Sequence, residues 1–386
     1  MPCPMRSANI RYLPAVDHLR AFAALLILVY HGLHVMAYRL RFDADFGIDH
    51  WLQPGNPLLA ALAEGHTAVG LFMVLSGFIL TFGSLDAAIA YRPFIRNRLL
   101  RTYPLFLLLV FAGVASLPGG FAWPAALQTV AGFANLPGAL VAPPFTSMLW
   151  TIAVEWQFYV LMPLLLVVLK KGWRRNLLGM LAVLLVFRVC AVLVGGSPRE
   201  IAYQNILGRL DQFLIGMWAA WAYRQWPLSR RSGALCAVLA LAAVVAALAT
   251  FNAIGGWPVQ AGWKVVWPTL EGVMWAAFLL GYVSWASQPT GAWSRVLVWI
   301  GTISYSIYLI HFVVIQLLIQ QVGLVRFSGG FMVDALLNTL LFALPATLAL
   351  SALTWRFVEL PFLRLRGNYH LAPASAPASG GRVSGA

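Results

Sequence analysis

Charged and titratable side chains occur inside stretches of this sequence that are otherwise almost entirely apolar. Arg20 and His31 lie in one such stretch, and Glu155 lies in another. In a helix, at about 100° and 1.5 Å per residue, Arg20 and His31 would share one face, about 20° apart and about 16 Å apart in height. A histidine can transfer a proton near neutral pH, an arginine can bind an anion, and a buried carboxylate must pair or be protonated. Proton transfer and anion binding are therefore the chemistry to expect.

Each of these residues also has a purely structural interpretation. Arg20 could extend to the membrane surface, and His31 could be a satisfied interior histidine. Glu155 could form a structural ion pair with Arg188 or Arg209. A charge in hydrocarbon costs roughly 2.5 to 3.5 kcal/mol on insertion scales, so each one is a functional candidate by default.

Two further motifs carry polar residues of the same kind. YRPFIRNRLLRTYP places Arg98 and Arg101 three residues apart on the opening turn of a predicted helix, where both guanidinium groups can face one phosphate-rich ligand. Ordinary anchoring at the inner membrane surface is the alternative. In ISYSIYLIHFVV, His311 lies among serine and tyrosine hydroxyls that could bond between helices or line a polar cavity, so packing and a site role are both open.

Composition identifies the elements that must position these residues. The 386 residues are 61% hydrophobic and 10% charged, with a mean hydropathy of +0.80. Soluble proteins are about half apolar and a quarter charged, so a soluble fold is excluded. Apolar runs of about 20 residues predict an all-α, polytopic transmembrane helical bundle. Ten spans are predicted, at 18–39, 58–83, 100–118, 147–169, 176–195, 203–222, 233–251, 265–286, 296–320 and 331–355. The stretch 121–142 is broken by prolines and glycines and is predicted to be a short interfacial or re-entrant piece.

Topology follows from the basic residues, which should collect in the cytoplasmic loops. Ten spans with both termini cytoplasmic satisfy this rule, and the chain is expected in the cell membrane. The same rule explains the net charge of +14, so no nucleic-acid partner is expected. Cys3, Cys190 and Cys236 show neither metal-ligand nor disulfide spacing and are predicted free thiols. Residues 1–366 form the predicted membrane domain, and 367–386, which are small, polar and rich in Pro and Gly, a disordered cytoplasmic tail.

Depth along the predicted spans adds one more expectation. Helical rise places seven ionisable side chains near one level of the membrane, which predicts a polar cavity opening toward the outer leaflet with Arg20 and the 92–101 loop at its cytoplasmic mouth. The seven are His31, His66, Glu155, Arg188, Asp211, Glu271 and His311.

Six stretches together resemble the acyltransferase family 3 membrane proteins, which transfer acyl groups to extracytoplasmic sugars and related acceptors. RYLPAVDHLRAFAALLILVYH is similar to the family opening, with its arginine and histidine at Arg20 and His31. The others are TAVGLFMVLSGFILT, RNRLLRTYP, LWTIAVEWQFYVLMPLLL around Glu155, ISYSIYLIH and WRFVELPF with Glu359. His18 after Asp17, and Gly70, depart from the family pattern. Some relatives append a soluble hydrolase-like domain, and none is expected here.

The resemblance implies an acyl-coenzyme A co-substrate, commonly acetyl, reaching the site from the cytoplasm, and a carbohydrate or glycoconjugate acceptor. Acyl transfer needs a base for the acceptor hydroxyl and positive charge where the oxyanion develops. His31 is the expected base, Arg20 the partner of the donor or oxyanion, and Glu155 the residue that orients a histidine or the acceptor. Arg98 and Arg101 would hold coenzyme phosphates. The expected supporting residues are His311, His66, Asp17 and Glu359.

No GxSxG or HExxH motif occurs, so no metal, no serine-hydrolase triad and no permanently bound cofactor are expected. A proton-coupled secondary transporter or exporter is the alternative function, because buried histidines and carboxylates also build proton relays. The acceptor, the acyl chain length and the oligomeric state are not fixed by these motifs.

Overall fold

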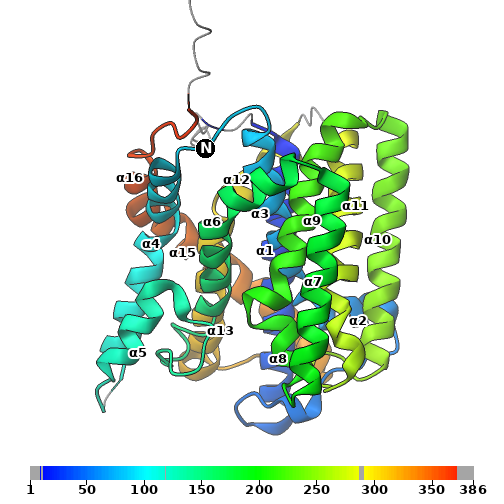
Figure 1. The fold of residues 1–386 in the computed structure, drawn as a ribbon. Coiled ribbons are helices and arrows are strands. Elements are labelled where there is room, and N and C mark those ends of the chain that lie inside the picture. Colours follow the sequence, from blue (N-terminus) through cyan, green and yellow to red (C-terminus); the bar gives the residue numbers. More distant parts are fainter. Residues whose placement is uncertain (1–8, 10–11, 118, 287–290, 372–386) are drawn as a thin grey trace, which may run out of the picture.

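The computed structural model describes residues 9, 12–117, 119–286 and 291–371 of the chain. Figure 1 shows a bundle of long helices that lie side by side and extend from one end of the molecule to the other. Among the described residues there is no strand, only one isolated antiparallel bridge between Ile89 and His370. The prediction of an all-α helical membrane bundle is therefore confirmed.

Eight helical segments are long and apolar enough to cross a membrane. They are α1 (Pro14–Phe42), α3 (Thr67–Ser84), α4 (Tyr91–Ala115), α6 (Leu149–Lys170), α7 (Trp173–Leu193), α10 (Arg230–Ala253), Ser304–Val322, which begins with α13 (Ser304–Leu317), and Phe331–Leu363, which contains α14 (Phe331–Asn338), α15 (Leu344–Thr354) and α16 (Leu360–Leu363). Two further helices, α9 (Ile206–Gln225) and α11 (Trp267–Trp285), match the two remaining predicted spans in position and length but carry buried charges. A count of ten spans thus stays a prediction.

Two of the predicted spans are divided in the structure. The 58–83 span is split into α2 (Pro57–Ala63) and α3, and the break between them holds Glu64, Gly65 and His66. Glu64 is fully buried and accepts hydrogen bonds from Trp51 and Asn252, so the polar break is satisfied inside the protein. The 296–320 span is likewise divided between α12 (Ala292–Thr302) and α13.

Short helices complete the chain. The stretch predicted to be a short piece contains α5 (Trp123–Gln128) and the single turn 129–133, with no helix long enough to span, as expected. The helix α8 (Pro198–Tyr203) precedes α9, and side chains cap both, since Ser197 accepts from the Glu200 amide and Asn205 from the Gly208 amide.

Glycines let α3 and α9 pack backbone to backbone at the centre of the bundle. A Cβ atom at Gly77 would lie 2.1 Å from the Phe213 carbonyl oxygen, and one at Gly216 would lie 2.1 Å from the Val74 carbonyl oxygen. Small residues at such crossings allow close helix approach in a membrane, where packing rather than the hydrophobic effect drives association. This contact holds α9 against α3, the helix that begins directly after the break at residues 64–66.

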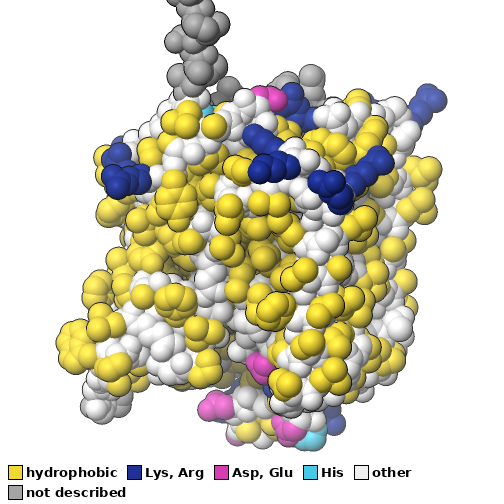
Figure 2. Space-filling view, viewed as in Figure 1, with side chains coloured by type: hydrophobic (Ala, Val, Ile, Leu, Met, Phe, Trp, Pro, Cys, Tyr) yellow, Lys and Arg dark blue, Asp and Glu magenta, His cyan; other side chains and the backbone are white. Residues whose placement is uncertain are grey.

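The two ends of the bundle differ in their content of basic side chains. Lys and Arg side chains gather at one end in Figure 2, and a broad band of apolar side chains covers the rest of the face shown. We call this the basic end. It is the end where α4 and α10 begin and where α6 and α9 finish, and its basic residues include Arg92, Arg96, Lys170, Lys171, Arg174, Arg224, Arg230 and Arg231.

The chain beyond the last long helix is also packed. Tyr369 is 1% exposed, and its ring contacts Phe94 edge-on at 5.3 Å between centroids. The described residues after 366, which the sequence assigned to the tail, therefore include a packed side chain at Tyr369. The remainder of the predicted tail, 372–386, lies outside the described residues.

At the end opposite the basic end, Lys264 is completely buried in the turn 262–265 between α10 and α11. Its Nζ donates to the carbonyl oxygens of Gly256 and Trp257 at 3.0 and 2.6 Å and lies over the rings of Tyr203 and Phe251, among others. Burial lowers the pKa of this ammonium group to about 8. The carbonyl and ring contacts stabilise the charge but do not fully replace water.

This lowered pKa predicts how stability depends on pH. Between pH 8 and the ordinary lysine value of about 10.5, the unfolded chain holds a proton at Lys264 that the folded chain has released, so stability increases with pH in that window. The thermal midpoint of the native protein in detergent should therefore rise relative to Lys264→Met as pH goes from 8 to 10. Lys171→Met, at an exposed residue, should show no such trend. A constant difference between native protein and Lys264→Met would contradict the expectation.

Candidate active site

A cavity of about 120 Å³ lies inside the bundle, among residues of α1, α3, α4, α6 and α13. Four of the residues predicted to do chemistry line it, namely Arg20, Arg98, Arg101 and Glu155. The other polar residues of its wall are Ser76, Thr102, Thr151, Tyr159, Ser304, Tyr305 and Tyr308. The first span, the third-span arginine pair and the fourth span therefore meet at one enclosed place.

Two of the three arginines in the cavity wall are held by carboxylates. Arg20 Nη1 lies 3.1 Å from Asp17 Oδ1, one turn earlier on α1. Arg101 Nη1 lies 3.0 Å from Glu359 Oε2, and this carboxylate is fully buried and also accepts a hydrogen bond from Ser306. Asp17 and Glu359 thus orient two guanidinium groups at the wall of the cavity.

Arg98 differs from both. It is 9% exposed, and none of the described residues forms an ion pair with it. Its Nε is buried without a hydrogen-bond partner, and its guanidinium carbon lies 5.7 Å from the ring centres of Phe94 and Tyr159. A buried charge with only aromatic contacts is costly unless something else compensates it. Its place in the cavity wall makes an anionic ligand the natural partner.

Glu155 faces the same cavity. It accepts hydrogen bonds from the Ser76 hydroxyl at 2.7 Å and from the Tyr159 hydroxyl at 2.5 Å. The alternative of a structural ion pair with Arg188 or Arg209 is wrong, because those arginines have other partners. Among the described residues no histidine donates to Glu155, so its contacts are with hydroxyl groups.

His31 and His311 form a direct pair. His311 Nε2 lies 2.9 Å from His31 Nδ1, and His311 Nδ1 lies 3.0 Å from the Ile307 carbonyl oxygen. A carbonyl oxygen can only accept, so His311 Nδ1 carries the proton and its Nε2 accepts from His31 Nδ1–H. In the neutral pair this leaves the lone pair of His31 on Nε2. His31 is half-buried, whereas His311 is fully buried.

The histidine pair lies next to the end of the cavity that is formed by Tyr308. Tyr308 lines the cavity, hydrogen-bonds Thr151 at 2.8 Å and lies 5.9 Å from the His311 ring, measured between centroids. His311 follows it by three residues, or about 4.5 Å along the helix, away from the basic end. Neither histidine is itself part of the cavity wall. The histidine pair thus lies behind Tyr308, beyond the cavity wall that carries the three arginines.

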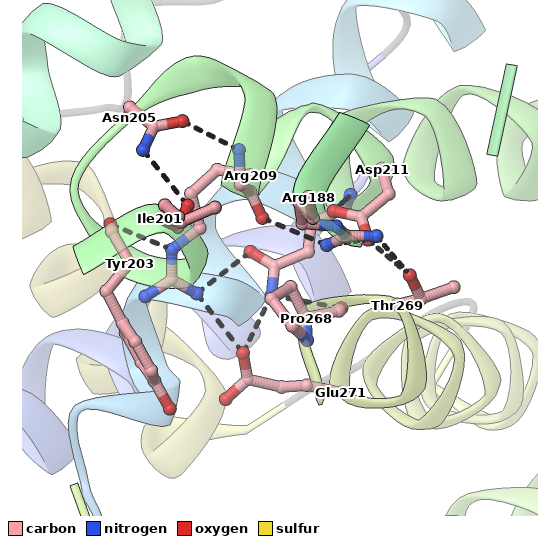
Figure 3. Close-up of polar contacts among 11 residues, drawn as sticks. Arg188, Ile201, Tyr203, Asn205, Arg209, Asp211, Pro268, Thr269 and Glu271 are labelled. Carbon is pink, nitrogen blue, oxygen red and sulfur yellow. Dashed lines mark hydrogen bonds and ion pairs between the residues drawn. The ribbon is translucent and has the colours of Figure 1, made fainter. Parts of the chain in front are cut away.

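The other ionisable residues of the predicted layer do not open onto this cavity. Figure 3 shows Arg188 paired with Asp211 and Arg209 paired with Glu271, at 3.0 and 3.2 Å. All four are at most 1% exposed. One shared polar cavity is therefore wrong for Arg188, Asp211 and Glu271, because they neutralise one another in a closed network between α7, α9 and α11.

His66 has a separate environment. Its Nε2 lies 2.9 Å from Glu64 Oε2, and its ring contacts Tyr30, which in turn contacts His31. Sequence reasoning missed Glu64, although an acidic residue two positions before a histidine inside a predicted span was a usable signal. Among the described residues, no group of three or more His, Cys, Asp or Glu could hold a metal ion.

These features define a class: a helical membrane protein with a cavity lined by three arginines and, next to its wall at Tyr308, a histidine pair. Comparison with known sequences then gives the family. The sequence model described as an acyltransferase domain (Acyl_transf_3) matches residues 13–356, so the chain belongs to the acyltransferase 3 family. The resemblance found in the motifs is confirmed, and an acyltransferase is favoured over the transporter alternative.

The chain is also similar to curated proteins. It is 28% identical to "Acyltransferase MdmB" of Streptomyces mycarofaciens, over 95% of this chain and 96% of that protein. It is 27% identical to "Putative peptidoglycan O-acetyltransferase YrhL" of Bacillus subtilis and 24% identical to a "Putative O-acetyltransferase" of Staphylococcus aureus, over 94% and 92% of this chain. The chain spans 56% and 58% of the lengths of these two relatives. No solved structure was found to match it.

Proposed function

We propose that this protein is an O-acyltransferase of the cell membrane that moves an acyl group, commonly acetyl, from cytoplasmic acyl-coenzyme A to a hydroxyl of a carbohydrate or glycoconjugate at the outer side of the membrane. The observation that carries the proposal is the unpaired guanidinium of Arg98 in the wall of a cavity whose Tyr308 side borders the histidine pair. The acyltransferase family supplies the reaction class.

In this proposal the donor enters from the basic end, which the distribution of Lys and Arg assigns to the cytoplasm. Arg98 and Arg101 bind phosphate oxygens of the coenzyme, for which the guanidinium fork is well suited. Arg20 belongs with them, because it lies about 16 Å from His31 along α1 and so cannot reach a carbonyl group held beside that histidine. The sequence left two possible partners for Arg20, the oxyanion and the acyl donor. This distance favours the acyl donor.

The histidine pair supplies the base. His31 Nε2 takes the proton of the acceptor hydroxyl, whose oxygen attacks the thioester carbonyl. The carbon–sulfur bond then breaks, and the coenzyme leaves as a thiol after receiving that proton. His311 accepts from His31 Nδ1–H throughout, which fixes the tautomer and stabilises the imidazolium ion that forms. Glu155, bonded to two hydroxyl groups, orients the donor arm or the acceptor within the cavity.

Arg98→Ala tests the donor site. A charge-assisted contact to a phosphate contributes about 1.5 to 3 kcal/mol, so the Kd for coenzyme A should rise about 10- to 100-fold, and less so at high salt. The measurement is titration of the purified, detergent-solubilised protein with coenzyme A, followed by turnover of labelled acetyl-coenzyme A. Arg92→Ala is the matched control, since Arg92 is an exposed arginine of the same helix.

The same experiment distinguishes the two functions. Thioester consumption by the native protein, reduced in Arg98→Ala and retained in Arg92→Ala, supports the proposal. If the native protein neither binds nor consumes acyl-coenzyme A, the donor assignment fails and a proton-coupled transporter becomes the better hypothesis.

A further inference from the structure

The last described residues form a strap across the basic end of α4. We call residues 364–371 the C-terminal strap. Asn97 holds it in both directions, because its Nδ2 donates to the Gly367 carbonyl oxygen at 2.7 Å and its Oδ1 accepts from the Gly367 amide at 3.1 Å. Asn97 is 2% exposed and directly precedes Arg98. The strap is therefore fixed to the turn of α4 that carries the unpaired arginine.

Further contacts make the position of the strap specific. Asn9 donates to the Gly367 carbonyl oxygen at 2.9 Å and accepts from the Tyr369 amide at 2.8 Å. The Ala90 amide donates to the Tyr369 carbonyl oxygen at 2.8 Å, and Tyr369 itself is buried against Phe94. A segment with this many buried backbone bonds is a built part of the fold rather than a loose end.

The strap carries a fourth arginine beside the turn of α4 that holds Arg98. Arg366 is next to Gly367, is only partly exposed, and donates from Nε to the Leu363 carbonyl oxygen at 3.2 Å. Burial, followed by the positive charges of Arg101, Arg98 and Arg20, lowers the pKa of Arg366 to about 10. These are the three arginines of the cavity wall. Arg366 thus belongs to the same cluster although it lies beyond residues 13–356, which the family model matches.

Charge in this cluster is not balanced by the protein. Asp17 pairs with Arg20 and Glu359 pairs with Arg101, while Arg98 and Arg366 form no ion pair with any residue that the structure describes. Like charges held close together raise the free energy of the folded state unless an opposite charge is present. Two arginines without a carboxylate partner, on segments joined by the Asn97–Gly367 hydrogen bonds, suit a ligand with more than one phosphate.

We propose that Arg366 binds a phosphate group of the acyl donor alongside Arg98, and that the C-terminal strap is the element that holds it there. This inference rests on the proposed function, because it takes the donor to be a coenzyme with several phosphates. Phosphate groups of anionic lipids offer the same chemistry, so the experiment must distinguish a coenzyme phosphate from a lipid phosphate.

The test is titration of the purified full-length protein in a neutral detergent with coenzyme A and with dephospho-coenzyme A, which lacks the 3′-phosphate. We expect Arg366→Ala to weaken coenzyme A binding about tenfold, as for one lost phosphate contact. Arg364→Ala, an exposed arginine of the same strap, should stay within about twofold of native. Equal effects of the two substitutions would overturn the inference.

A double-mutant cycle tests the role of the strap. Asn97→Ala removes both bonds to Gly367 and should weaken binding by a similar factor, and combining it with Arg366→Ala should add little, since both changes remove the same contact. Fully additive losses in protein of native size-exclusion profile would show that Asn97 does not act through Arg366.

Two more arms separate the alternatives. If the loss in Arg366→Ala disappears with dephospho-coenzyme A, Arg366 binds the 3′-phosphate; if it persists, it binds the pyrophosphate, and both outcomes support the inference. If Arg366→Ala leaves coenzyme A binding unchanged but lowers co-sedimentation with phosphatidylglycerol vesicles, the ligand is lipid and the inference is wrong. Failure of the native protein to bind coenzyme A would instead overturn the proposed function.

Discussion

His31→Gln should abolish most acyl turnover while leaving donor binding intact. Removal of a general base typically lowers the rate by about 10²- to 10⁴-fold. The histidine is part of a pair that leaves its Nε2 free to accept a proton, and it lies about 16 Å along α1 from Arg20, so it should not contribute to holding phosphates. We therefore expect kcat to fall by that factor and the Kd for coenzyme A to stay within about twofold of native.

The measurement is turnover of labelled acetyl-coenzyme A by purified protein, with titration of coenzyme A in parallel. His50→Gln is the control, because His50 is an exposed histidine outside the pair. A folded His31→Gln protein with native turnover would remove His31 from the mechanism. Loss of donor binding together with turnover would instead indicate a general structural role.

His311 should act as a positioning residue for His31. Its Nε2 accepts from His31 Nδ1, so His311→Leu removes that acceptor, while His311→Gln retains an acceptor oxygen near the same place. If His311 has a structural role alone, the two variants should have similar kcat values. If it positions His31, kcat should be higher in His311→Gln than in His311→Leu, and the pH profile of kcat should shift in the leucine variant only.

The sequence allowed the general architecture to be predicted because membranes impose strong rules. Apolar runs of about 20 residues and the asymmetry of Lys and Arg gave helices close to their observed positions. The α2–α3 break was missed, since the run 58–83 is apolar apart from Glu64 and His66, and the protein satisfies those two internally through residues such as Trp51 and Asn252.

The candidate site was predictable only in part. The spacing of Arg20 and His31 on one helix and of Arg98 and Arg101 on another followed from helical periodicity. The ion-pair partners of the buried charges could not be predicted in this way. Depth in the membrane gives one coordinate of a residue, whereas an ion pair depends on all three. Glu155 could have paired with Arg188 by depth alone, yet Arg188 reaches Asp211 on a neighbouring helix. Arg366 was missed for another reason, since nothing in the sequence predicts the hydrogen bonds between Asn97 and Gly367 that hold its segment against α4.

The buried ion pairs of Figure 3 should be essential for the fold. Arg188 Nη1 lies 3.0 Å from Asp211 Oδ2, and the Thr269 hydroxyl is within hydrogen-bond distance of both, so the pair joins α7, α9 and α11. Asp211→Asn leaves the arginine charged and unpaired in a fully buried site, a change that costs about 3 to 5 kcal/mol in proteins. We expect a large loss of folded protein and a thermal midpoint lowered by about five degrees.

Thermal unfolding in detergent, read by size-exclusion chromatography, checks this expectation. The double variant Arg188→Met with Asp211→Leu should recover most of the stability, because it removes both charges and keeps apolar volume. Asp86→Asn breaks the exposed pair with Arg224 and should have little effect. A double variant no more stable than Asp211→Asn would show that the pair contributes more than mutual neutralisation.

The contrast with Arg98 makes the experiment informative about function as well. Arg188 is matched by a carboxylate inside the fold, whereas Arg98 is buried in the cavity wall with aromatic contacts alone. Arg98→Ala should therefore leave the thermal midpoint unchanged or raise it while it weakens donor binding, since it relieves an uncompensated charge. Opposite effects of the two substitutions on stability would separate the charges that hold the helices together from those that are kept for a ligand.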